Sequence, residues 1–201
     1  DLLAHLDQPD KMAGYCSQLV ECNPYVVGCA IAFKPYYYPG RELAMIYVHR
    51  KGYKAGGDAK DFVTQESFGN RPYTEQDWYV KPMKKGTPLW LDPLKDNDTE
   101  DEPITTFCLP IFNRTGQRVG VLAFDVSIRM LSKGVLDSKP SVNGYCTMLG
   151  RDGSYIVHPD TNKLFHETVF TLEKRGADAS VVKAGRAMVA GKTDYMRFKM
   201  D

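Results

Sequence analysis

The fold is decided by residues 104–126, which read ITTFCLPIFNRTGQRVGVLAFDV. Two apolar runs, residues 104–112 and 118–126, are rich in the β-branched and aromatic residues that favour strands. Between them, Asn113-Arg114-Thr115-Gly116 has the composition of a hairpin turn, with glycine where a positive φ is needed. The stretch therefore predicts two long antiparallel strands.

Outward from this hairpin, helical and strand patterns predict one α+β module and a fragment of a second. Helical patterns cover residues 2–22, 74–85 and 178–190, a further helix begins at residues 127–131, and strand patterns cover residues 26–33, 43–50, 145–149, 154–157 and 193–200. Asn23-Pro24 ends the first helix, and Gly86 ends the second in the usual position for a left-handed residue. The polar stretch 132–141 marks the boundary between the modules.

The composition is that of a globular protein. The chain has 201 residues, 43% of them hydrophobic and 25% charged, which excludes disorder, collagen and coiled coil. The formal net charge of +1 and the lack of a basic tract argue against nucleic-acid binding. No apolar run is long enough to span a bilayer. The chain begins inside a helical pattern without Met, so we expect a piece of a longer protein whose membrane anchors lie outside it.

The five cysteines give no sign of a zinc site, because their number is odd and no CxxC is present. Cys16 and Cys22 could pair in an oxidising compartment, but a spacing of six does not place them on one helix face. Five unpaired thiols are the favoured interpretation.

No metal, cofactor or catalytic site is expected. His166-Glu167 begins like a zinc-protease motif but lacks the second histidine, and the acidic stretch 96–101 lacks the glycine of a calcium loop. No nucleophile–base signature is present, so we expect no enzymatic activity in this segment.

Aromatic and acidic residues form the remaining constellation. Trp78-Tyr79 lies on a predicted helix, Trp90 and Asp92 alternate along an extended segment, and Asp125 shares a strand face with apolar side chains. Aromatic rings with one or two acids can form a cage for an ammonium group or a small polar solute. In the alternative interpretation, Trp78 and Trp90 are core residues and Asp125 caps the helix that begins near residue 127.

The order of these features resembles a double Cache (dCache) sensor domain. The resemblance rests on Trp78-Tyr79, on residues 86–93, 103–111 and 120–127, and on residues 148–160, which resemble the opening hairpin of a second module. It implies PAS-like modules with central antiparallel sheets, preceded by a long N-terminal helix. The implied domains are a helix at 1–24, a membrane-distal module at 25–135 and an incomplete membrane-proximal module at 136–201.

The resemblance also implies a location and partners. Such domains lie outside the bacterial cytoplasmic membrane between two transmembrane helices, which would flank this fragment. They bind a small molecule and signal to a histidine kinase, a metal-dependent protein phosphatase or another effector. We expect a homodimer formed through the N-terminal helix. The alternative is a structural or dimerisation spacer that binds no ligand.

The site residues implied by the resemblance all lie in the membrane-distal module. They are Tyr73, Gln76, Trp78, Tyr79, Trp90, Asp92, Thr106 and Asp125. Many family members that bind amino acids carry an arginine two residues before the Trp-Tyr pair to hold the ligand carboxylate, and here Gln76 stands there. Asp125 matches the acid that holds the ligand amine. Since the carboxylate clamp is missing, the expected ligand is an amine or another small polar solute rather than an ordinary α-amino acid.

Overall fold

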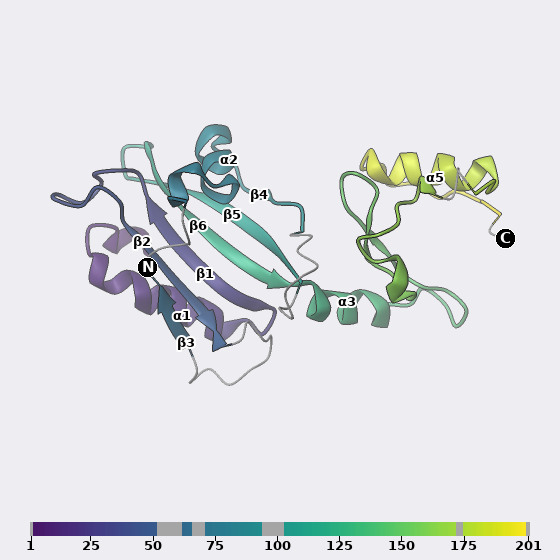
Figure 1. The fold of residues 1–201 in the computed structure, drawn as a ribbon, viewed down its shortest axis with the longest axis horizontal. Helices are drawn as coiled ribbons and strands as arrows, with labels where there is room; N and C mark the ends of the chain where they lie inside the picture. Colours follow the sequence, from purple (N-terminus) through teal and green to yellow (C-terminus); the bar gives the residue numbers. More distant parts are fainter. Residues whose placement is uncertain (1, 52–61, 66–70, 94–102, 172–174, 200–201) are drawn as a thin grey trace. The chain divides into compact units, whose positions relative to one another are not determined.

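The computed structural model describes the whole chain except residues 1, 52–61, 66–70, 94–102, 172–174 and 200–201 (Figure 1). The chain divides into two compact units, Asp1–Ser127 and Ile128–Asp201. The expected boundary after residue 135 falls inside helix α3 (Ile128–Asp137). Ile128 packs with Ile156 and Val157, so α3 shares its core with the second unit. The acidic stretch 96–101 lies outside the described residues.

The first unit contains a six-stranded antiparallel sheet in the order β3-β2-β1-β6-β5-β4. Its strands are β1 (Val26–Phe33), β2 (Met45–Arg50), β3 (Phe62–Gln65), β4 (Leu89–Trp90), β5 (Ile104–Phe112) and β6 (Arg118–Ser127). The predicted hairpin is confirmed as β5–β6, and Gly116 in its turn has a φ of +77°. The mixed α/β architecture with a central antiparallel sheet is confirmed.

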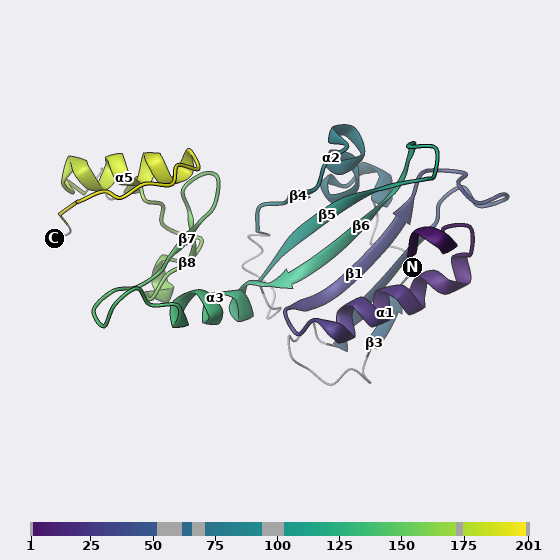
Figure 2. The same ribbon diagram turned by 180° about the vertical axis from the view of Figure 1, so that it is seen from behind.

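Helices cover both faces of this sheet (Figures 1 and 2). Helix α1 (Met12–Cys22) packs on one face, and α2 (Asp77–Lys85), preceded by the 3₁₀ turn η5 (Tyr73–Glu75), packs on the other. Cross-strand partners point to the same face, so the pairing register assigns each strand residue to the α1 face or the α2 face.

Strand β1 divides its residues by size between the two faces. Cys29, Ile31 and Phe33 belong to the core on the α1 face. Ala30 and Ala32 belong to the core on the α2 face, which Gly28 shares by alternation along the strand. The α2 face is therefore shallow along β1, and tyrosine rings from other elements fill it.

The N-terminal helix is shorter than predicted. Instead of one helix over residues 2–22, the structure has two 3₁₀ turns, η1 (Leu2–His5) and η2 (Pro9–Lys11), followed by α1. Proline has no N–H to donate and clashes with the preceding turn, so Pro9 begins a new helical segment rather than continuing one. The predicted end before Asn23 is confirmed.

Two arginines from the sheet bind the C-terminal carbonyls of the two helices, which sequence patterns did not indicate. Arg50, only 4% exposed, donates from Nη2 to the Val20 carbonyl at 2.6 Å and from Nε to the Val26 carbonyl at 3.0 Å. The exposed Arg118 donates from Nη1 to the carbonyls of Met83 and Lys84, at 2.6 and 2.9 Å. The carbonyls of Val20, Met83 and Lys84 are acceptors that a helix end leaves open, whereas the Val26 carbonyl belongs to the start of β1.

The second unit holds α3, β7 (Met148–Leu149), β8 (Tyr155–Val157), the 3₁₀ turn η6 (Thr161–Lys163) and α5 (Ala179–Val189). The predicted hairpin turn is confirmed, with Gly153 at a φ of +79°. The strand predicted over residues 145–149 is shorter in the structure, where only β7 at its end forms, and the strand predicted over residues 193–200 is wrong, because residues 193–199 form no strand. In the described part of the chain, no helix is long and apolar enough to cross a membrane.

The buried and the exposed arginine should contribute unequally to the free energy of unfolding. Arg50→Met should lower the free energy of unfolding by about 2–4 kcal/mol, because buried carbonyls lose a charged donor that water cannot replace. Arg118→Met is the matched control and should cost about 1 kcal/mol or less, since water reaches the α2 carbonyls. Urea unfolding of both variants measures this, and equal costs would contradict the assignment.

Candidate ligand-binding site

Asp125 is the centre of the candidate site. It lies in β6 on the α2 face, where it pairs with Thr106 in β5 and Gly28 in β1. The Tyr47 hydroxyl donates to its Oδ2 at 2.7 Å and the Thr106 hydroxyl donates to its Oδ1 at 2.7 Å. Both carboxylate oxygens are thus held by side chains of the sheet, one from β2 and one from β5, so Asp125 does not serve as the cap of α3.

Tyr47 reaches Asp125 only because residue 28 is glycine. Tyr47 lies in β2, and its ring crosses β1 at Gly28 to reach β6 on the far side. A Cβ on Gly28 would lie 2.3 Å from the Tyr47 hydroxyl oxygen and 2.8 Å from two ring carbons. Sequence reasoning missed Tyr47. The available signal was an isolated glycine within an apolar strand, which indicates a close approach of another group.

The electrostatic setting of Asp125 is unfavourable for a negative charge. Burial raises the pKa of the Asp125 carboxyl, and the hydrogen bonds from Tyr47 and Thr106 and the charge of His49 offset this only in part. His49 is buried and stacks on Tyr47 with ring centroids 5.2 Å apart. Within the described residues, no ion pair involves Asp125. The carboxylate is therefore suited to a cationic group.

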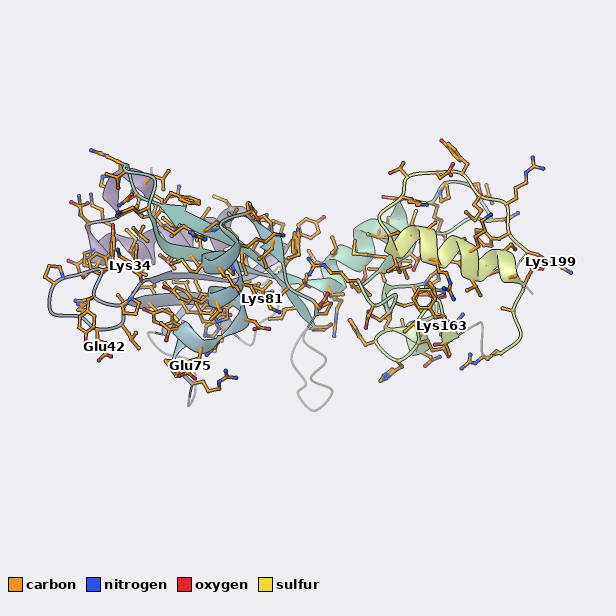
Figure 3. All side chains as sticks on the ribbon, turned by 90° about the horizontal axis from the view of Figure 1, so that it is seen from above. Lys34, Glu42, Glu75, Lys81, Lys163 and Lys199 are labelled. Carbon is orange, nitrogen blue, oxygen red and sulfur yellow. The ribbon has the colours of Figure 1, made fainter. Side chains whose placement is uncertain are left out.

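Three aromatic residues of η5 and α2 pack over this face of the sheet. Ring centroids lie 5.1 Å apart for Tyr73 and Tyr79, 6.2 Å for Tyr73 and Trp78, and 6.1 Å for Trp78 and Tyr79. The Tyr73 hydroxyl donates to the Phe33 carbonyl at 2.7 Å and accepts from the Ala44 N–H at 3.1 Å. Figure 3 looks onto this segment and labels Glu75 on η5 and Lys81 on α2.

Gln76 is tied to its own segment. Its Oε1 accepts a hydrogen bond from the Trp78 indole at 2.7 Å, and its Nε2 donates to the Arg71 carbonyl at 3.1 Å. Neither bond reaches the sheet. The amide therefore orients Trp78, and it offers no charged fork comparable to the arginine that this position carries in the resembled pattern.

Trp90 and Asp92 are not brought together with Asp125. Trp90 pairs with Phe107, one residue away from the Thr106–Asp125 pair, so its side chain points to the α1 face. It is 45% exposed, and its ring lies 4.8 Å from that of Phe107. Asp92 is exposed. The same exposure excludes Trp90 as a core residue.

A separate pocket of about 290 Å³ lies near the start of α1. Its lining includes Asp10 of η2, Arg41 of the β1–β2 connection and Phe33. None of the eight expected site residues borders it. Over the described residues, no group of three or more His, Cys, Asp or Glu side chains could hold a metal ion.

A family comparison identifies what this architecture is. The model of the family "Methyl-accepting chemotaxis protein-like, first PDC sensor domain" matches residues 13–133. The chain belongs to this family. The matched residues include the whole sheet, helix α2 and all of α1 except Met12. No curated protein matches the chain.

Solved structures with the same fold are sensor domains. The extracellular domain of mmHK1S-Z3, named as a histidine kinase, has a TM-score of 0.69 and 18% identity over 92% of this chain and 67% of its own. The periplasmic sensory domain of the Campylobacter jejuni chemoreceptor Tlp1 has a TM-score of 0.57 and 13% identity over 98% of this chain and 77% of its own. The ligand-binding domain of the Pseudomonas aeruginosa amino acid chemoreceptor PctB, in complex with L-Arg, has a TM-score of 0.53 and 15% identity over 82% of this chain and 55% of its own. At these identities the likeness shows the fold alone.

The approach of Tyr47 to Gly28 predicts a position-specific cost. Gly28→Ala should lower the free energy of unfolding by about 1–3 kcal/mol, because the new methyl group displaces the Tyr47 ring. Gly14→Ala in α1 is the control: nothing lies within 4 Å of its added methyl group, so it should stabilise the helix by about 0.5–1 kcal/mol. Denaturant unfolding compares the two, and an unaffected Gly28→Ala variant would refute the packing.

The raised pKa of Asp125 predicts a pH dependence. The folded state holds this proton more tightly than the unfolded state, so Asp125 lowers stability as pH rises above the ordinary aspartate pKa of 3.8. Asp125→Asn should therefore gain stability relative to the native protein as pH rises above 3.8. Unfolding at several pH values measures the difference, with exposed Asp92→Asn as the control. A flat difference for Asp125→Asn would show that its carboxyl is not perturbed.

Proposed function

We propose that this chain is the ligand-sensing part of an extracytoplasmic double Cache receptor, with a membrane-distal module and part of a membrane-proximal one. The distal module binds an amine or another small polar solute on its α2 face. Transmembrane helices outside this chain connect it to a cytoplasmic effector such as a histidine kinase or a metal-dependent protein phosphatase. Family membership and the fold of the neighbours support the sensor role.

One observation carries the ligand assignment, namely a partly buried carboxylate that forms no ion pair within the described residues. Asp125 lies beneath a segment rich in aromatic rings, and its two hydroxyl partners leave lone pairs open on the carboxylate. A ligand ammonium group would supply the missing charge, and aromatic faces favour such a group. Burying a carboxylate without an oppositely charged partner costs free energy, and a bound ammonium group would offset that cost.

Gln76 supports an amine over an ordinary α-amino acid. A bidentate bond between arginine and a ligand carboxylate is strong and geometrically specific, and Gln76 can offer only an amide. Its hydrogen bonds to Trp78 and Arg71 already use both ends of that amide. PctB, which has the same fold, is named in complex with L-Arg. The loss of the clamp is the basis for expecting a different ligand class here.

Signalling would follow from the position of α2. A ligand that binds between α2 and the sheet favours one arrangement of that segment over another, and only this difference in affinity can shift the equilibrium. In the full-length receptor, a homodimer formed through the N-terminal helix would carry the change toward the membrane.

A binding screen tests the proposal. We expect a primary amine, and not an α-amino acid, to raise the melting temperature of the chain in a thermal-shift panel of amines, amino acids and organic acids. Asp125→Asn should weaken that compound about 10- to 100-fold in calorimetry, because a charge-assisted bond is lost. Asp92→Asn on the exposed β4 segment should leave its affinity unchanged. An unchanged affinity in Asp125→Asn would overturn the site.

The second candidate is a structural or dimerisation spacer without a ligand. The packing of Tyr73 and Tyr79, both nearly fully buried on the α2 face, favours it. In that case no compound class in the panel should shift the melting temperature.

A further inference from the structure

His158 is a buried histidine in the second unit, directly after the end of β8. It is 7% exposed and contacts two tyrosine rings. Its ring centroid lies 4.8 Å from that of Tyr155 and 5.4 Å from that of Tyr145, and both pairs meet edge to face. The packing of the second unit therefore fixes the position of the imidazole ring.

The backbone of Asp160 determines which ring nitrogen carries the proton. The Asp160 N–H donates a hydrogen bond to Nδ1 of His158 at 2.9 Å. A ring nitrogen that accepts a hydrogen bond has no proton of its own, so the ring is neutral and its proton is on Nε2. Both nitrogens of a charged histidine are donors, so protonation would remove the acceptor that Asp160 uses.

The bond between His158 and Asp160 lies at the start of a segment, residues 160–165, that packs against β8. Oδ1 of Asp160 accepts from the Asn162 N–H at 3.1 Å, and the Phe165 N–H donates to the Tyr155 carbonyl at 2.9 Å. Phe165 packs against the core of this unit although its φ is +61°, a value that residues other than glycine disfavour. Contacts with the rest of the unit therefore keep the segment in place against its own backbone preference.

We propose that His158 is an acid-sensitive switch whose protonation breaks the bond to the Asp160 N–H and loosens residues 160–165 from β8. A proton on Nδ1 would face the N–H of Asp160, so two donors would meet with no acceptor between them. A buried donor without a partner is unfavourable, and opening of the turn lets water satisfy both groups. At neutral pH the uncharged ring keeps the turn closed.

The charged groups around His158 determine the pH range of the switch. Burial and the positive charge of Lys163 lower the pKa of His158. The backbone and carboxylate of Asp160 and the charge of Glu167 oppose this shift only in part, and Glu167 is itself paired with Arg175 at 2.9 Å. The closed turn thus binds the proton less tightly than an open one, so its stability falls as pH drops below the ordinary histidine pKa of 6.5.

The switch is separate from the candidate ligand site, because His158 lies in the second unit and Asp125 in the first. In a domain outside the cytoplasm, as proposed above, the turn would meet the pH of the surroundings directly. Its opening requires no ligand, so it can be measured on the chain alone, whatever binds at Asp125.

Amide hydrogen exchange tests the proposal on the 201-residue chain at about pH 7.5 and about pH 5, corrected for the intrinsic effect of pH on exchange. We expect the protection of residues 160–165 to fall about 10-fold at the lower pH, because one unit of pKa difference between the closed and open turn changes their ratio tenfold. Ring ¹⁵N shifts should show the Nε2–H form of His158 at the higher pH. Equal protection at both pH values, or an Nδ1–H form, would overturn the proposal.

His158→Asn is the matched variant. The Oδ1 of its amide can accept from the Asp160 N–H in place of Nδ1, but the amide does not titrate. We expect it to keep residues 160–165 protected at both pH values, whereas His158→Ala should leave them unprotected at both. A loss of protection in acid that persists in His158→Asn would show that another group is responsible. The native chain and His158→Asn decide the question even where His158→Ala does not fold.

Discussion

Strand β1 is buried along its whole length on both faces, and the first unit is arranged around this constraint. An eight-residue strand with no exposed position needs a neighbour on each edge and a covering layer on each side. Strands β2 and β6 supply the edges, and α1 and α2 supply the layers. Large side chains fill the α1 side, so the small residues fall on the other side and leave room there for tyrosine rings.

Tyr47 and Asp125 make use of that room. The missing side chain at Gly28 lets a ring from β2 cross β1 and donate to a carboxylate on β6. The hydroxyl groups orient the carboxylate but bring no positive charge, so its pKa stays raised. Asp125 lowers the stability of the unliganded fold and favours a cation, and both properties suit a binding site. An apolar residue at this position would give a more stable core.

Residues close together in sequence predicted most of the helices and strands. Which side chains meet at the candidate site depends instead on the pairing of strands that are far apart in sequence. The β5–β6 hairpin and the ends of α1 and α2 follow from turn and cap residues adjacent in sequence. Asp125 was singled out because side chains alternate along a strand. Trp90 was grouped with it, but it lies on the opposite face, since the pairing of β4 with β5 is not encoded within either strand. Tyr47 lies 78 residues from Asp125, and only the strand order brings them together. Pro9 likewise divides the segment over residues 2–22 that the helical pattern predicted as one helix.

The two faces of the sheet differ in how they can respond to a ligand. On the α1 face, aliphatic, thiol and aromatic groups form the core, and the buried Arg50 binds the end of the helix, so displacing α1 would expose unpaired carbonyls. On the α2 face, tyrosines contribute rings with polar ends, and Arg118 holds the end of α2 from an exposed position where water can replace it. Displacing α2 is therefore cheaper than displacing α1. A solute bound at Asp125, as proposed, would therefore act on α2 more readily than on α1.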